Sequence, residues 1–164
     1  MSIEGEPLDE GAEIRETGGG KFQLEIHAGG VTFLADEPAS AGGLGSGPNP
    51  YDLLSSALGA CTAMTLRLYA DRKAWPLKSV TVRVIHRRAG LEAKDHFARE
   101  IVLEGDLAPE QRRRLLEIAN RCPVHQTLDR GSEVITVLAE RTVAGGLDPE
   151  PVSQMNDMAE ACQD

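Results

Sequence analysis

The sequence predicts a mixed fold in which antiparallel strands pack on one long central helix. Two observations support this prediction. From Leu53 to Leu66 the chain carries no charge, and its apolar side chains recur with helical spacing. On either side of this run, shorter segments alternate apolar and polar residues, which is typical of half-buried strands. With 164 residues the chain fits one domain. We expect that domain to span residues 1–141, with residues 1–11 flexible and residues 142–164 forming an acidic tail.

The segments before the central helix predict a small antiparallel meander. Residues 12–17 and 21–28 have the composition of strands. Gly29-Gly30 is a two-residue hairpin signal that leads into a further strand over residues 31–35. Residues 36–50 are rich in glycine, proline, alanine and serine and show no periodicity, so we expect a loop that delivers the chain to the central helix.

The central helix has a clear start and a row of small residues. Asn49 suits the N-cap, Pro50 suits the first helical position, and Asp52 in the first turn favours the helix dipole. Gly59, with small residues around it, weakens a helix by about 1 kcal/mol relative to alanine. We therefore expect a second helix, from this chain or from another copy, to cross closely at Gly59. The predicted apolar stripe consists of Leu53, Leu54, Ala57, Leu58, Cys61, Met64, Thr65 and Leu68.

After the central helix, the sequence predicts a long hairpin. Trp75-Pro76 ends the helix, because a residue before proline is pushed away from helical angles. Residues 79–88 and 96–105 both alternate and are joined by a polar connection, which predicts two antiparallel strands with one face on the central helix. The apolar positions of the second strand are Phe97, Ile101 and Leu103.

The last part of the domain predicts helices and a final strand. Pro109 stands near the first turn of a helix that Cys122-Pro123 interrupts, and residues 123–128 have room for one or two further helical turns. Residues 133–140 are apolar on both faces and predict a buried strand. A weaker helical pattern covers residues 155–162. The predicted buried face of the first of these helices is Leu115, Leu116, Ile118 and Ala119.

The composition excludes several functional classes. A net charge of −9 and an isoelectric point near 4.9 argue against nucleic-acid binding. Three cysteines do not form the even framework of a small secreted domain. The acidic N-terminus lacks the basic start and apolar core of a signal peptide, and the uncharged run is too short to span a bilayer. We expect a cytoplasmic protein with reduced thiols and neither nucleic-acid nor membrane partners.

Two cysteines are candidates for chemistry. Cys61 lies about three turns into its helix, too far for the helix dipole to activate it, so periodicity alone favours a core cysteine. Cys122 follows a helix break, and if Pro123 starts a helix, Cys122 lies where thiolates are stabilised. Cys122 and His125 also have the spacing of two metal ligands, but a structural zinc site needs about four, and we expect no metal. We expect no role for Cys162.

Two blocks of sequence carry a family resemblance. The first is GPNPYDLLSSALGACTAMTLRLYADRKAWPL, which contains Cys61, and the second is LLEIANRCPVHQTL, which contains Cys122. In this order they resemble the OsmC/Ohr family of thiol-dependent hydroperoxide reductases, and its OsmC-like members most of all. The resemblance covers roughly Phe22 to Leu138.

The resemblance implies a fold, an assembly and a set of roles. The fold is α+β and OsmC-like, with antiparallel sheets packed on the long helix that carries Cys61, in an intertwined homodimer. Cys61 is then the peroxidatic cysteine, which attacks a peroxide and becomes a sulfenic acid. Cys122 is the resolving cysteine, which forms a disulfide with Cys61. An external dithiol reductant resets the pair, and no cofactor is required.

The sequence departs from the family at two positions. In Ohr-type members a glutamate lies ten residues before the first cysteine, and here that position is Tyr51, with Asp52 beside it as a candidate acidic partner. The family also uses an N-terminal arginine beside the thiolate. Arg15 is the arginine that precedes the helix, and Arg67 points to a different helix face from Cys61. The cation is therefore unassigned, with His125 as a candidate from its spacing to Cys122.

These observations lead to one hypothesis and one alternative, with metal binding through Cys122 and His125 as a third possibility. The hypothesis is a peroxidase that reduces organic hydroperoxides through a Cys61 sulfenic acid resolved by Cys122. An apolar pocket around Cys61 would favour organic hydroperoxides over hydrogen peroxide. The alternative is an OsmC-like dimer that binds an apolar small molecule without peroxidase turnover, which the missing glutamate favours.

Overall fold

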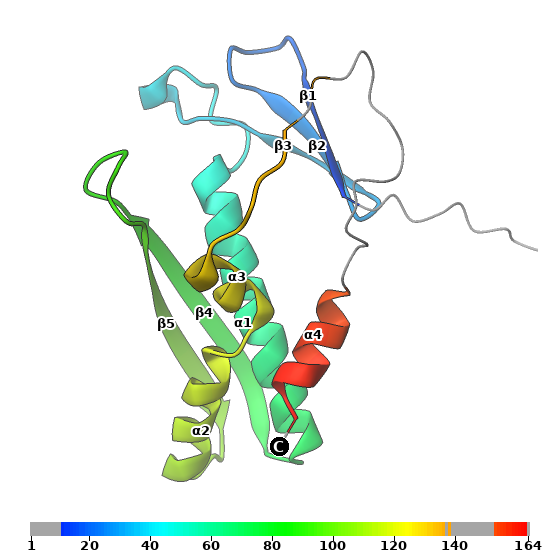
Figure 1. Ribbon diagram of the computed structural model, residues 1–164, viewed down its shortest axis with the longest axis vertical. Helices are drawn as coiled ribbons and strands as arrows, with labels where there is room; N and C mark the ends of the chain where they lie inside the picture. Colours follow the sequence, from blue (N-terminus) through cyan, green and yellow to red (C-terminus); the bar gives the residue numbers. More distant parts are fainter. Residues whose placement is uncertain (1–10, 137, 139–152, 164) are drawn as a thin grey trace, which may run out of the picture. The chain divides into compact units, whose positions relative to one another are not determined.

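The computed structural model describes residues 11–136, residue 138 and residues 153–163, which form two compact units (Figure 1). The first unit contains the described residues up to Leu53, together with Thr136 and Leu138. The second unit contains residues 54–135 and 153–163. The prediction of a single domain over residues 1–141 stays a prediction.

The first unit contains a three-stranded antiparallel sheet in the order β1-β2-β3. Its strands are β1 (Ala12–Glu16), β2 (Leu24–Ala28) and β3 (Val31–Ala35). Gly29 and Gly30 form the predicted hairpin turn, and both have positive φ angles, of 58° and 75°, as a type I′ turn requires. β2 begins at Leu24, later than the sequence predicts, because a run of turn residues separates it from β1.

The loop after β3 is held by one buried carboxylate. Asp36 accepts hydrogen bonds from the backbone amides of Glu37, Leu44 and Ser46 and from the Ser46 hydroxyl, at 2.7–3.2 Å. The loop also contains the short 3-10 helix η1 (Ala39–Ala41). Its fixed course leads the chain to the start of the long helix.

The long helix α1 (Pro50–Arg72) starts as the sequence predicts. The Asn49 side chain accepts a hydrogen bond from the Asp52 amide at 3.0 Å, and the Asp52 carboxylate accepts one from the Asn49 amide at 3.1 Å. This reciprocal cap satisfies two of the backbone donors that a helix start leaves free.

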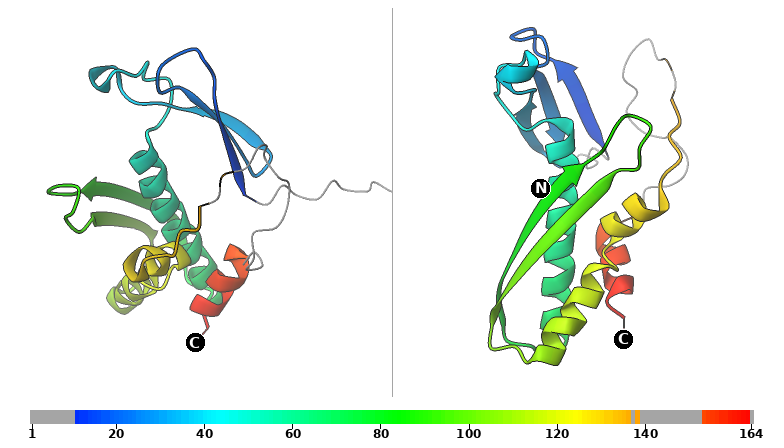
Figure 2. Two further views of the ribbon diagram at one scale, coloured as in Figure 1. Left: turned by 45° about the horizontal axis from the view of Figure 1, so that its top comes forward. Right: turned by 90° about the vertical axis from the view of Figure 1, so that its left-hand side faces the viewer.

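In the second unit, a long hairpin runs along α1 (Figures 1 and 2). Its strands are β4 (Leu77–Arg87) and β5 (His96–Gly105), which pair antiparallel with a register shift between Leu77 and Ser79. The position of both strands agrees with the prediction from alternation. One face of the hairpin packs on α1, since Val80, Ile101 and Leu103 contact the core that α1 supplies.

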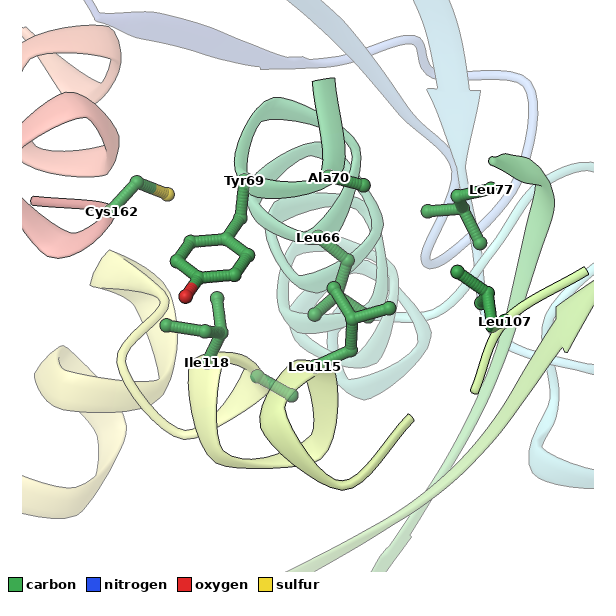
Figure 3. Close-up of a cluster of buried hydrophobic side chains, with 9 residues drawn as sticks. Leu66, Tyr69, Ala70, Leu77, Leu107, Leu115, Ile118 and Cys162 are labelled. Carbon is green, nitrogen blue, oxygen red and sulfur yellow. The ribbon is translucent and has the colours of Figure 1, made fainter. Parts of the chain in front are cut away.

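The main core of the second unit joins four elements. Leu66, Tyr69 and Ala70 of α1 pack against Leu115 and Ile118 of α2 (Pro109–Ala119), as Figure 3 shows. Leu77 and Leu107 close this core at the base of the hairpin, and Cys162 contributes from the end of α4 (Gln154–Ala161). Arg72 also donates to the Ala159 carbonyl at 2.9 Å. The helical pattern in the acidic tail therefore belongs to a helix that packs on the core.

Within this chain the element that approaches Gly59 is a strand and not a helix, and a crossing by the helix of another copy stays a prediction. A Cβ atom placed on Gly59 would lie 3.4 Å from Val84 Cγ2 and 3.9 Å from Val82 Cγ1, so the element that approaches is strand β4. The apolar stripe is also narrower than predicted, because Leu54 and Met64 are exposed. Leu116 of α2 is exposed too, whereas Leu115 and Ile118 are fully buried as predicted.

The prediction of a buried strand over residues 133–140 is wrong for its described part. Residues 133–136 belong to no strand, and the side chains of Val134, Ile135 and Leu138 are exposed. Residues 137, 139 and 140 lie outside the described residues. β-branched side chains give a segment strand propensity, but a strand also needs a neighbour for its backbone hydrogen bonds, and the described part of this single chain provides none here.

Candidate active site

Cys61 and Cys122 meet in a second buried cluster of the second unit. Leu58 and Cys61 come from α1, and Cys122 lies directly before α3 (Pro123–Arg130). Both thiols are reduced and almost completely buried, with exposures of 1% and 0%. The partly buried apolar side chains around them are Val84, Phe97, Val124 and Leu128. The topology thus brings two cysteines from distant parts of the chain into one apolar environment.

The start of α3 provides a hydrogen-bond donor to each sulfur. The Val124 amide donates to Cys61 Sγ at 3.5 Å, and the His125 amide donates to Cys122 Sγ at 3.4 Å. This arrangement follows from Pro123, which occupies the first helical position and makes Cys122 the N-cap. The first amides of a helix have no partners within the helix, so they are available to stabilise negative charge on sulfur.

Arg99 of β5 connects the elements around Cys122. Its Nη1 donates to the Thr62 hydroxyl at 2.8 Å and to the Ala119 carbonyl at 2.9 Å. Its Nη2 donates to Asn120 Oδ1 at 2.9 Å and to His125 Nδ1 at 3.1 Å. Because arginine only donates, Nδ1 of His125 accepts, and the proton of the neutral imidazole is assigned to Nε2. Arg99 therefore ties α1 to the break between α2 and α3.

Thr62 links this arginine to the sulfur of Cys122. Its side chain is fully buried on α1, and its hydroxyl lies 3.7 Å from Cys122 Sγ and 2.7 Å from the Leu58 carbonyl. The hydroxyl accepts from Arg99 and has a single proton to donate. It can therefore turn toward the Leu58 carbonyl or toward a negatively charged Cys122 sulfur.

The pKa values of the two thiols are shifted in opposite directions. A hydrogen bond from Cys61, the amide of His125, the hydroxyl of Thr62 and the charge of Arg99 lower the pKa of Cys122 to about 6, against the opposing effect of burial. The same contact with Cys122, together with burial, raises the pKa of the Cys61 thiol. The directions of the two pKa shifts therefore favour negative charge on Cys122 over negative charge on Cys61.

The last helix also reaches the pair. The Gln154 side chain of α4 donates a hydrogen bond to the Cys61 sulfur. The third cysteine, Cys162, lies apart from the pair in the main core, where its thiol donates to the Thr65 carbonyl at 3.6 Å and burial raises its pKa. α4 thus contributes a side chain to the cluster and at the same time encloses Cys162.

A comparison with models of known protein families shows the family to which this chain belongs. A family model described as OsmC-like protein matches residues 43–137, which is more than half of the chain and includes both cysteines. The chain belongs to the OsmC-like protein family. A search among curated protein sequences gives no match to it. Within the described residues, no helix is long and apolar enough to cross a membrane.

Solved structures of OsmC and Ohr proteins share the α+β fold of this OsmC-like chain. An OsmC-like protein from Mycoplasma pneumoniae has a TM-score of 0.59 at 18% identity, over 73% of this chain and 84% of that one. The organic hydroperoxide resistance protein OsmC from Legionella pneumophila has a TM-score of 0.55 at 22% identity, over 71% and 86%. OhrB of Bacillus subtilis, an organic hydroperoxide resistance protein, has a TM-score of 0.52 at 20% identity, over 71% of this chain and 87% of that one.

The other candidate site residues of this OsmC-like chain have partners near their own elements. Asp52 caps the start of α1, and nine residues of helix separate it from Cys61, about 13 Å along the axis. Arg15 pairs with the neighbouring Glu13 on β1. Arg67 donates to the carbonyls of Leu77 and Lys78, at 2.6 and 3.0 Å.

His125 contributes to the pair through its backbone. Its amide donates to Cys122, while its ring accepts from Arg99 and so has no Nδ1 lone pair left for a metal ion. Within the described residues, no group of three or more His, Cys, Asp or Glu side chains gathers as a set of metal ligands. The spacing of Cys122 and His125 is thus that of an N-cap residue and the helix amide that donates to its side chain.

Arg99 is the residue that the sequence analysis missed. It lies on β5 in the same alternating series as Phe97 and Ile101, which face the core. An arginine among inward-facing apolar positions is costly unless it is hydrogen-bonded, so its presence there was a signal of a polar site. Arg99 is neither close in sequence to the cysteines nor N-terminal to the central helix, so sequence spacing does not indicate it.

Proposed function

We propose that this OsmC-like chain is a thiol-dependent peroxidase that reduces organic hydroperoxides. In this proposal Cys61 attacks the peroxide, Cys122 resolves the resulting sulfenic acid, and an external dithiol reduces the disulfide. The observation that carries the proposal is the contact between the two buried thiols, each with an amide donor from α3. Two structural neighbours are named as organic hydroperoxide resistance proteins, which supports the substrate class.

The surroundings of the pair favour an organic substrate. Leu58, Val84, Phe97 and Leu128 offer hydrocarbon contacts to the organic part of a hydroperoxide. Hydrogen peroxide has no such part and gains nothing from these contacts. The difference in transition-state binding should therefore appear as a difference in kcat/KM between the two peroxides.

The reaction divides into two displacements. The Cys61 thiolate attacks the distal peroxide oxygen, the O–O bond breaks, and the alkoxide leaves as the alcohol after it takes up a proton. The Cys122 thiolate then attacks the sulfur of the Cys61 sulfenic acid and displaces hydroxide, which becomes water. The resulting disulfide returns to two thiols by exchange with an external dithiol, which supplies two electrons and two protons and itself becomes a disulfide.

We also propose that the chain works as a homodimer. Leu54 and Met64 on α1 expose apolar side chains, as do Val134 and Ile135 after α3. The last two belong to the segment with strand propensity, and a neighbouring strand from a second copy would satisfy its backbone groups. Contiguous exposed apolar side chains are typical of interaction surfaces.

The test of the proposed function is a peroxidase assay with matched cysteine variants. Purified protein should consume cumene hydroperoxide in the presence of a dithiol reductant, and Cys61→Ser should abolish this turnover. Without reductant, one equivalent of peroxide should convert Cys61 and Cys122 into an intramolecular disulfide, which peptide mass spectrometry detects.

Cys162→Ala is the matched control, because Cys162 is equally buried but lies outside the pair. It should retain turnover. Full turnover by the Cys61→Ser variant would contradict the mechanism. Binding of an apolar compound without any peroxide consumption by the unmodified protein would favour the alternative, a dimer that binds small molecules.

A further inference from the structure

We infer that Arg99 is a positioning residue for the resolving step, because its side chain joins the chain segment of Cys61 to the chain segment of Cys122. This inference rests on the proposed function, since it concerns how Cys122 reaches the Cys61 sulfenic acid. Arg99 is half-buried on β5, and both terminal nitrogens of its guanidinium group donate hydrogen bonds. The positions of the acceptors along the chain indicate its role.

On the Cys122 side, Arg99 holds the chain both before and after the cysteine. It donates to the carbonyl of Ala119, the last residue of α2, and to Oδ1 of Asn120, the C-cap, both at 2.9 Å. It also donates to Nδ1 of His125, in the first turn of α3, at 3.1 Å. The Ala119 carbonyl accepts from the Cys122 amide as well, at 3.4 Å. One side chain therefore fixes both ends of the break that carries Cys122.

On the Cys61 side, Arg99 holds the next residue of α1. The acceptor is the hydroxyl of Thr62, at 2.8 Å, and the Thr62 side chain is fully buried. Because Thr62 and Cys61 are consecutive residues of one helix, fixing the first also fixes the second. The guanidinium group is planar and its donors have set directions, so Arg99 determines how α1 and the break lie relative to each other.

The resolving step depends on this placement. As the Cys122 sulfur attacks the Cys61 sulfenic acid, the S–S bond forms, the S–O bond breaks, and hydroxide leaves and becomes water. A disulfide forms only when the two Cα atoms are about 4.4–6.8 Å apart and the torsion about the S–S bond is near its preferred value. Cys122 lies between two helices, so its position depends on the groups that hold the break.

A second peroxide molecule competes with Cys122 for the sulfenic acid. In that reaction the O–O bond breaks, the Cys61 sulfur takes a second oxygen, and the peroxide leaves as the alcohol. The product is a sulfinic acid, which a dithiol does not reduce. Arg99 therefore protects Cys61 from overoxidation by keeping Cys122 in place. Its charge acts in the same direction, because it lowers the pKa of Cys122 and favours the attacking thiolate.

The deciding experiment times the two steps separately. Reduced full-length protein is mixed with one equivalent of cumene hydroperoxide without reductant, and peptide mass spectrometry follows the Cys61–Cys122 disulfide while peroxide loss is recorded. In Arg99→Met, the conversion of sulfenic acid into disulfide should slow by about 10- to 100-fold, because a misplacement of about 1 Å can cost about 100-fold. Peroxide loss should change much less, since the acceptors of Arg99 are groups other than the Cys61 sulfur.

Two chemical traps report the delay in Arg99→Met. Dimedone, which reacts with sulfenic acids, should label Cys61 more strongly than in the wild type. With excess peroxide, the variant should also accumulate the Cys61 sulfinic acid sooner. A role in general stability would not produce these two products selectively, because it would slow the formation of the sulfenic acid itself.

Further variants separate geometry from charge and from folding. Arg99→Lys keeps the charge but lacks the planar set of donors, so it should restore only part of the rate. Asn120→Ala removes one acceptor from an exposed residue and should give a smaller delay in the same direction. The matched control is Arg83→Met on the same hairpin, where Arg83 is exposed and faces Glu100, and both rates should be unchanged. Circular dichroism checks that each variant is folded.

Diamide tests the positioning role apart from peroxide chemistry. This oxidant accepts two electrons and two protons from a pair of thiols, and it should couple Cys61 to Cys122 in the reduced wild-type protein. The same disulfide should form more slowly in Arg99→Met, because the reaction again requires the Cys122 sulfur to reach Cys61.

Each outcome bears on the inference. Disulfide formation at the wild-type rate in Arg99→Met would overturn it. Equal slowing of peroxide loss and of disulfide formation would overturn it as well, because Arg99 would then support the site as a whole. If the wild-type protein consumes no peroxide while Arg99→Met delays the diamide disulfide, the proposed function fails and the positioning role is supported.

Discussion

Thr62→Val isolates the contribution of one hydroxyl to the acidity of Cys122. Valine has nearly the same shape as threonine but lacks the group that lies 3.7 Å from the Cys122 sulfur. A hydrogen bond to a charged group contributes about 1.5–3 kcal/mol, and the long contact places this one at the lower end. Since about 1.4 kcal/mol corresponds to one pKa unit, the pKa of Cys122 should rise from about 6 to about 7.

The assay is the ultraviolet absorbance of the thiolate near 240 nm, measured on reduced protein as the pH is raised. The signal that disappears in Cys122→Ser identifies the Cys122 step. Thr65→Val is the matched control, because Thr65 is also fully buried on α1 and its hydroxyl also donates to a carbonyl four residues earlier, that of Cys61, at 2.7 Å.

Two results are expected if the Thr62 hydroxyl donates to the Cys122 thiolate. The pH midpoint of the Cys122 titration should rise in Thr62→Val and should equal the wild-type midpoint in Thr65→Val. An unchanged midpoint in Thr62→Val would refute the view that the hydroxyl donates to the Cys122 thiolate. Equal shifts in both variants would assign the effect to a general change in packing on α1.

Three further predictions concern stability. The pKa of Cys122 is about 6 in the folded chain, below the ordinary value of 9.0. The ionised Cys122 therefore stabilises the fold fully above pH 9, and this contribution is lost as the pH falls through about 6. In urea unfolding, the difference in free energy of unfolding between wild type and Cys122→Ser should be larger at pH 9 than at pH 6. Gly59→Ala should stabilise α1 by up to about 1 kcal/mol, while Gly59→Leu should cost about 1–3 kcal/mol against Val84, as thermal unfolding would report. Leu115→Ala should cost about 2–5 kcal/mol in the same assay, because the side chain is fully buried.

Local patterns were sufficient to predict most of the fold. The N-cap at Asn49, the turn at Gly29-Gly30 and the start of α3 at Pro123 depend on neighbours in sequence, and all three are present. Alternation placed β4 and β5 because a half-buried strand imposes that pattern by itself. These features need no knowledge of which distant segment packs where.

Features that depend on a distant partner were harder to predict. Gly59 signals that something approaches α1 closely, but the sequence does not say whether it is a helix or a strand, and it is β4. Residues 133–136 have strand propensity, yet pairing needs a neighbour that the described part of one chain lacks. Leu54 and Met64 belong to the apolar pattern of α1, but no other part of the described single chain covers them, and they are exposed.

The candidate site illustrates the same division between local and distant information. Sequence alone identified Cys61 and Cys122 and placed Cys122 at a helix start, because the break at Pro123 is local. The pKa of Cys122 is lowered instead by partners from distant elements, first Cys61 of α1 and, among the others, the charge of Arg99, which alternation places on the inward face of β5. An arginine at such a position is accommodated by acceptors and a counter-charge. In this chain the acceptors are neutral, so the natural counter-charge is a thiolate, and a search for inward-facing charged residues on strands would find this cation without a family motif.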